Sequence, residues 1–179
     1  MMRKLLVLWL FFGITFMAEA QEERFPTRAV YAELGGMGLV YSVNYDMRFH
    51  KDKMDGWGVR AGLGGYVYSD RSLFTLPVQL NKLFGKENHF FEIGAGATLV
   101  NYQETEYSVG NGSANETTDK HWHFILDMEE TPSFMGTINF GYRMVPDEPG
   151  FTWRANLTPI FNQNGFWPLF AGIGFGYAF

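Results

Sequence analysis

The sequence predicts an all-β protein, an eight-stranded antiparallel up-and-down β-barrel that crosses a membrane. Three observations lead to this fold class. Apolar residues alternate with small or polar residues along most of the chain, no segment shows the spacing of an amphipathic helix, and a single long connection interrupts a series of short turns. We expect one barrel domain at residues 21–179, preceded by a cleaved signal peptide at residues 1–20.

The N-terminal residues 1–20 have the parts of a secretory signal peptide. Arg3 and Lys4 form a positive start, an apolar run follows at residues 5–17, and an Ala-x-Ala motif then precedes Gln21. The apolar run is shorter than the ~20 residues of a transmembrane helix. We therefore expect cleavage before Gln21 and export, with an uncleaved N-terminal anchor as the alternative.

Eight segments carry the two-residue period that predicts a strand. In chain order they lie at residues 30–34, 39–49, 57–64, 74–80, 91–99, 134–143, 151–158 and 169–179. The second is the clearest, because every odd position is apolar or aromatic while Ser42 and Asn44 stand at even positions. Pro77 and Pro159 each remove a hydrogen bond from the strand ladder, so we expect bulges or early strand ends at these two positions.

The composition of the two strand faces distinguishes a membrane barrel from a soluble lipocalin-like barrel. A soluble barrel has a charged outer face, whereas here the polar face consists of Gly, Ser, Thr and Asn with few charged residues. Such a face fits the crowded interior of a narrow barrel, and the continuous aliphatic and aromatic face fits lipid. A strand of ~11 residues, tilted by ~40°, spans roughly 28 Å, which is close to the thickness of the hydrocarbon layer.

The connections give these strands an orientation, because barrels of this kind have short periplasmic turns and longer external loops. The turns at 50–56, 85–89 and 146–150 are expected on the periplasmic side, and the connections at 35–38, 69–72, 101–133 and 162–167 outside. The single long connection, 101–133, is therefore external. Aromatic residues beside the periplasmic turns form an interfacial girdle, namely Phe49, Trp57, Phe84, Phe151 and Phe179.

The strand phase also points seven charged side chains into the lumen: Glu33, Asp46, Arg48, Arg60, Glu92, Arg143 and Arg154. Opposite charges must pair where water is scarce, so we interpret these residues as a salt-bridge network that plugs the barrel. A gated, narrow pore is the alternative function for the same residues. Eight strands leave no wide channel once side chains are placed, so any conductance would be small.

The overall composition excludes several functions. The net charge is −5 and no basic stripe is present, which argues against a nucleic acid partner. The chain has no cysteine, which excludes disulfide bonds, thiolate metal sites and a cysteine nucleophile. The hydrophobic fraction of 46% excludes a disordered chain. No cofactor is expected.

The long external connection contains His121 and His123, which project to one side of an extended segment. This spacing is a weak metal signal, because a metal site needs a third fixed donor. The same histidines, joined by a serine of this connection, suggest a lipid-modifying or proteolytic enzyme as an alternative function, although no motif fixes that geometry. The connection is strongly acidic, so we expect it to bind a basic partner or a divalent cation.

The C-terminal segment 171–179 resembles the closing strand of Gram-negative outer-membrane β-barrel proteins. Its aromatic residues Phe175, Tyr177 and Phe179 match the signal that the barrel assembly machinery reads in that class. The resemblance implies localisation in the outer membrane of a Gram-negative cell, with outer-membrane lipid and the assembly machinery as partners. The segments 33–36 and 42–45 also resemble parts of small envelope barrels, a likeness that implies no activity. We expect a monomeric or weakly oligomeric barrel with a structural or surface-interaction role and no catalysis.

Overall fold

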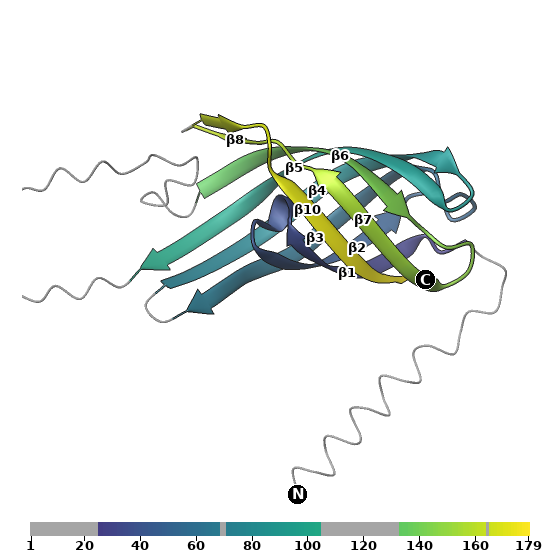
Figure 1. The fold of residues 1–179 in the computed structure, drawn as a ribbon, viewed down its shortest axis with the longest axis horizontal. Coiled ribbons are helices and arrows are strands. Elements are labelled where there is room, and N and C mark those ends of the chain that lie inside the picture. Colours follow the sequence, from purple (N-terminus) through teal and green to yellow (C-terminus); the bar gives the residue numbers. More distant parts are fainter. Residues whose placement is uncertain (1–24, 69–70, 105–132, 164) are drawn as a thin grey trace, which may run out of the picture.

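The structure is a computed structural model that describes residues 25–68, 71–104, 133–163 and 165–179. Neighbouring strands are antiparallel throughout, and β10 pairs with both β1 and β7. The pairing of β5 with β6 closes the sheet, so the fold is the expected eight-stranded barrel (Figure 1). The barrel strands are β1 Arg28–Gly35, β2 Tyr41–Arg48, β3 Gly56–Tyr68, β4 Arg71–Lys86, β5 His89–Glu104, β6 Ser133–Met144, β7 Gly150–Leu157 and β10 Ala171–Ala178.

Two further short strands extend the seventh and eighth barrel strands. β8 (Ile160–Asn162) pairs with β6 in the same register as β7, so it continues the line of β7 beyond Pro159. β9 (Gly165–Trp167) pairs with β8 and leads into β10. In Figure 1 the β8–β9 hairpin bends away from the barrel wall.

The two prolines expected to disturb strands behave differently. β7 ends just before Pro159. On the side that faces β9 and β10, the pairing register shifts by one residue between β7–β10 and β8–β9, so residues 158–159 oppose residues 168–170 as a bulge. The expectation for Pro159 is therefore confirmed. The expectation of a bulge or strand end at Pro77 was wrong, because β4 runs through it and Pro77 stays opposite Thr98 of β5. Only the pairing with β3 is interrupted there, without a change of register.

The predicted inward and outward faces are confirmed by the burial of alternate residues. Along β2 the outward residues Tyr41, Val43 and Tyr45 are 40–60% exposed, whereas Ser42 and Asn44 are at most 4% exposed. The same alternation runs through β1, and Phe151, Phe175 and other aromatic residues lie on the outward face of β7 and β10. The barrel thus has an apolar exterior and a polar interior, the reverse of a soluble globular fold.

The two ends of the barrel differ. The first residues of β1 and the last residues of β10 lie together, at the right in Figure 1, and the connections at 49–55, 87–88 and 145–149 lie at this same end. We call it the terminal end. At the opposite end β4 and β5, with 16 residues each, extend beyond strands such as β1, which has eight. β5 continues to Glu104, past the expected start of the long connection at Asn101.

Candidate functional site in the barrel interior

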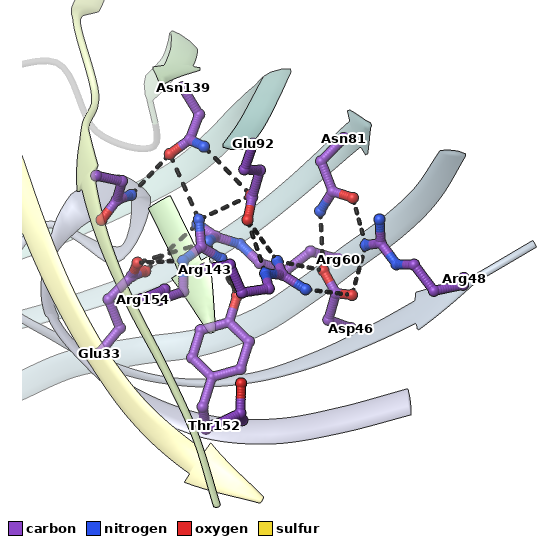
Figure 2. Close-up of polar contacts among 12 residues, drawn as sticks. Glu33, Asp46, Arg48, Arg60, Asn81, Glu92, Asn139, Arg143, Thr152 and Arg154 are labelled. Atoms are coloured by element: carbon purple, nitrogen blue, oxygen red, sulfur yellow. Dashed lines mark hydrogen bonds and ion pairs between the residues drawn. The ribbon is translucent and has the colours of Figure 1, made fainter. Parts of the chain in front are cut away.

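All seven charged residues that the strand phase placed in the lumen lie there in the structure. They come from six strands, and each is at most 7% exposed. Figure 2 shows their side chains pointing toward one another in the middle of the barrel. The glycines beside them provide the space, because a Cβ atom on Gly58 would lie only 2.3 Å from Cζ of Arg48.

The seven side chains form one chain of alternating charge, which we call the ion chain. In order it runs through Arg48, Asp46, Arg143, Glu92, Arg154, Glu33 and Arg60. Each carboxylate lies between two guanidinium groups, so the chain holds four positive and three negative charges.

The ion chain has short contacts from Arg48 to Arg154, beginning with the 2.5 Å contact between Arg48 and Asp46. Arg143 contacts Asp46 at 2.9 Å and Glu92 at 2.7 Å, and Arg154 contacts the other oxygen of Glu92 at 2.9 Å. Arg143 also donates two hydrogen bonds to the two oxygens of Asp46, at 2.9 and 3.0 Å. Two-point contacts of this kind fix the geometry of an Arg–carboxylate pair. The contacts of Glu33 are longer, 3.3 Å to Arg60 and 3.7 Å to Arg154.

Neutral polar side chains also belong to the network, and the site residues named from the sequence did not include them. The Tyr31 hydroxyl accepts hydrogen bonds from Arg60 and Arg154. Asn81 accepts one from Arg48 and donates one to Asp46 at 2.8 Å, and Asn139 donates to Glu92 at 3.2 Å. Tyr31, Asn81 and Asn139 occupy inward positions of their strands. The alternation that places the charged residues in the lumen therefore places these three neutral residues there as well.

The connection between β1 and β2 lies at the end opposite the chain termini and folds into the lumen. We call residues 36–40 the inward turn. It contains a single 3-10 turn, Gly36–Gly38, whose three residues are buried. Thr98 of β5 donates a hydrogen bond to the carbonyl of Met37 at 2.9 Å, and Thr75 of β4 donates one to the carbonyl of Gly38 at 3.1 Å. These bonds across the barrel hold the turn inside.

The inward turn contains a strained residue. Leu39 has φ 70° and ψ −67°, and the N–H of Val40 bonds to the carbonyl of Gly38 at 3.0 Å. This is a γ-turn of the uncommon form, with a positive φ that a leucine rarely adopts. The Leu39 side chain is buried against Leu73 and its neighbours, so packing holds the strained conformation.

Two apolar clusters enclose the ion chain. The cluster at the terminal end consists of Ala29, Tyr31, Met54, Leu83, Phe90, Val145 and Ala178. The cluster at the opposite end consists of Leu39, Leu73, Val100, Met135 and Ile160. A cavity of about 10 Å³ lies beside Ala29 and Tyr31 of the terminal-end cluster and is also lined by Arg143 and Arg154. It has about the space of one water molecule.

Several sequence expectations concern residues that the structure does not describe. His121, His123 and the signal peptide lie outside the described residues. Within the described ranges, no three His, Cys, Asp or Glu side chains are grouped to hold a metal ion. No helix in the described part of the chain is long and apolar enough to cross a membrane.

Phe175, Tyr177 and Phe179, the residues of the expected assembly signal, lie on the outward face of the C-terminal strand. Their exposed fractions are 50%, 51% and 44%. Phe175 stacks on Phe151 of the neighbouring strand β7, with ring centroids 6.3 Å apart. The three aromatic side chains thus form part of the apolar exterior.

The fold and the interior define the class of protein, a closed eight-stranded antiparallel β-barrel with an apolar exterior and buried charged residues in its interior. Among solved structures, the barrel is similar to the N-terminal β-barrel domain of OprF from Pseudomonas aeruginosa. The TM-score is 0.54 at 15% sequence identity, over 85% of this chain and 95% of the OprF domain. No family model matches the sequence, and no curated protein is similar to it in sequence.

Proposed function

We propose that the protein is an outer-membrane β-barrel with a structural and surface-presenting role, whose lumen is closed by the ion chain. The proposed role is not catalytic. Three features support it, namely the apolar exterior, the paired charges of the interior and the similarity of the fold to a barrel domain of OprF. The observation that carries most weight is the ion chain, enclosed at both ends by apolar side chains.

The exterior supports residence in a membrane. Large apolar side chains such as Leu34, Val43, Leu63 and Ile173 are 40–60% exposed on the outward faces of different strands. A continuous exposed apolar surface of this extent aggregates in water, whereas lipid covers it without cost. A closed barrel also leaves no unpaired strand edge in the hydrocarbon, which is the condition for a sheet to cross a bilayer.

The interior supports a barrel without a conducting path. An ion that crosses the lumen has to displace the terminal-end cluster, part of the ion chain and the inward turn in succession. Each guanidinium of the ion chain is paired with a carboxylate, and separating buried pairs of this kind costs several kcal/mol. These barriers favour a closed lumen over the narrow pore, which is the alternative.

The difference between the two ends supports an orientation. In barrels of this kind the chain ends lie on the same side of the membrane as the short periplasmic turns. We therefore assign the terminal end to the periplasm. The taller wall of β3, β4 and β5 and the connection 105–132 then face the exterior, where that acidic connection presents a binding surface. Phe175, Tyr177 and Phe179 at the terminal end of β10 are available to the barrel assembly machinery.

Single-channel recording tests the closed lumen. The folded protein is reconstituted into planar bilayers in 1 M KCl, with an empty-detergent addition as the control. We expect no reproducible conductance steps after insertion. Stable steps in the wild-type protein that vanish after Met37→Trp, which enlarges a side chain of the inward turn, would instead establish the pore.

Cell fractionation tests the location. Expressed in a Gram-negative host, the protein should be recovered with the outer membrane and begin at Gln21 when its N-terminus is sequenced. Recovery of a chain that begins at Met1 from the inner membrane would contradict both the location and the expected signal peptide.

A further inference from the structure

Lys82 is an isolated charge on the outward face of the barrel. Its outward neighbours along β4, Leu80 and Phe84, are 46% and 44% exposed. On the strands that the structure describes, the other outward charged side chains stand at strand ends, as Arg28 and Lys86 do. A charge within an apolar, lipid-facing surface is costly, so its presence requires a partner.

Two aromatic rings flank the Lys82 ammonium group. Its Nζ atom lies 5.6 Å from the ring centroid of Trp57 and 4.7 Å from that of Phe84. Trp57 stands directly opposite Lys82 in the pairing of β3 with β4. We call these three residues the Lys82 cradle. Cation–π contacts of this length stabilise a lysine and hold its ammonium group in one place.

The cradle supplies no anion of its own. Within the described ranges, no carboxylate forms an ion pair with Lys82, and Glu92, next to Ile93, the pairing partner of Lys82 on β5, points into the lumen. A lysine ammonium has three N–H donors, and two ring faces do not satisfy them. The group is thus fixed in position and still able to bind an anion from outside the protein.

The position of the cradle along the barrel identifies the source of that anion. Lys86 ends β4 four residues after Lys82, which places Lys82 roughly 10 Å from the terminal-end turn along the barrel axis. Aromatic residues near strand ends mark the boundary between the acyl chains and the headgroups. A lysine at this depth extends its side chain toward the headgroups while its methylene groups remain among apolar neighbours.

We propose that the Lys82 cradle binds the phosphate of a phospholipid in the leaflet at the terminal end of the barrel. The ammonium group pairs with the phosphodiester, Trp57 and Phe84 contact the glycerol region, and Leu80 contacts the acyl chains. This inference rests on the proposed function, because it requires the outward face to be in a membrane. The function of the Lys82 cradle is to fix the depth of the barrel in the bilayer.

Native mass spectrometry of the folded full chain tests the site. The protein in a non-ionic detergent is titrated with dioleoyl phosphatidylglycerol, and the bound lipid is counted for the wild type, for Lys82→Met and for the matched control Lys86→Met. Lys86 lies on the same outward face and strand but at its end. We expect Lys82→Met to weaken the first lipid-binding step about fivefold, the effect of one lysine near a charged surface, and Lys86→Met to weaken it less.

Two comparisons make the result specific. Dioleoylglycerol, which lacks the phosphate, should bind the wild type and Lys82→Met equally. Added salt should reduce the difference between the two proteins for phosphatidylglycerol. Equal phosphatidylglycerol binding by the wild type and Lys82→Met would overturn the site, and so would an equal loss in Lys86→Met, which would indicate unspecific attraction.

Insertion of the same proteins into vesicles separates this inference from the proposed function. If all three proteins insert and bind lipid equally, the proposed function stands and the Lys82 site falls. If the wild type does not insert at all, the outward face does not lie in lipid and both proposals are wrong.

Discussion

Glu92 is the residue on which the ion chain depends most, because it joins the guanidinium groups of Arg143 and Arg154 from the middle of the lumen. It is 1% exposed, so bulk solvent does not screen either pair. Burying charges costs free energy that the pairing repays only when the contacts are short and complete. The ion chain is therefore better understood as a device that specifies which side chains meet than as a large source of stability.

Removing the charge of Glu92 should be costly. We expect Glu92→Gln to lower the free energy of unfolding by about 3 kcal/mol, because two buried guanidinium groups each lose a partner. Arg48→Met, at the end of the ion chain, should cost less, since Asp46 keeps its contacts with Arg143 and Asn81. Urea unfolding from phosphatidylcholine vesicles, followed by tryptophan fluorescence, measures both values. Equal losses for the two variants would show that position in the ion chain does not matter.

At the scale of the elements, the outward face of β10 allows a direct test of lipid exposure. Ile173 is 40% exposed near the middle of this strand and stands opposite Leu34 of β1. We expect Ile173→Arg to lower the free energy of unfolding by roughly 2–4 kcal/mol, because it places a charge near the middle of the bilayer.

Leu169→Arg is the matched control for Ile173→Arg. Leu169 is 75% exposed in the connection between β9 and β10, toward the opposite end from the termini, where an arginine should cost about 1 kcal/mol or less. Both variants are unfolded from the same vesicles. If the two substitutions are equally tolerated, the exterior is not in contact with hydrocarbon.

The inward turn and the bulge after β7 are the elements that depart most from a regular barrel. Pro159 and Pro168 mark the bulge in the sequence, because neither residue can donate to the strand ladder. The inward turn has a weaker signal. Gly36 and Gly38 allow a tight turn, but the direction in which it folds depends on the space inside the barrel and on Thr75 and Thr98, which lie on other strands.

At the scale of the whole molecule, closure of the sheet predicts resistance to detergent. An unheated sample in dodecyl sulfate should migrate at a different apparent mass from a boiled one, because a closed barrel has no edge strand from which unfolding begins. Far-ultraviolet circular dichroism of the unheated sample should show a β-dominated spectrum. A protein that is monomeric and soluble without detergent, with the same spectrum, would favour the lipocalin-like barrel.

The connection between β5 and β6 should be separable from the barrel. We expect that replacing residues 105–132 by a short turn leaves the heat-dependent migration unchanged and abolishes binding of basic partners or divalent cations to intact cells. His121→Ala and His123→Ala, tested in parallel, should alter neither folding nor the lipid composition of the cells. Loss of a lipid or peptide turnover in either histidine variant would replace the structural role by an enzymatic one.

The sequence by itself determined on which side of the barrel wall each strand residue lies. A two-residue period has only two phases, and the presence of Val43 and Tyr45 on one face and Ser42 and Asn44 on the other leaves a single assignment. The strand number, the order of the strands and the location of the seven charged residues in the lumen follow from that local pattern and from the short turns. The same rule places neutral residues such as Tyr31 in the lumen.

Only the tertiary structure decided which of these residues meet. Asp46 and Arg143 lie 97 residues apart in the chain and on strands that are not neighbours, yet they form a two-point contact across the lumen. Such contacts depend on the stagger between strands when the barrel closes, which no local pattern encodes. The inward turn depends on the space inside the barrel, and the Lys82 cradle depends on an aromatic ring from a neighbouring strand. Both are set by packing between different segments and not by the alternation of residues within one strand.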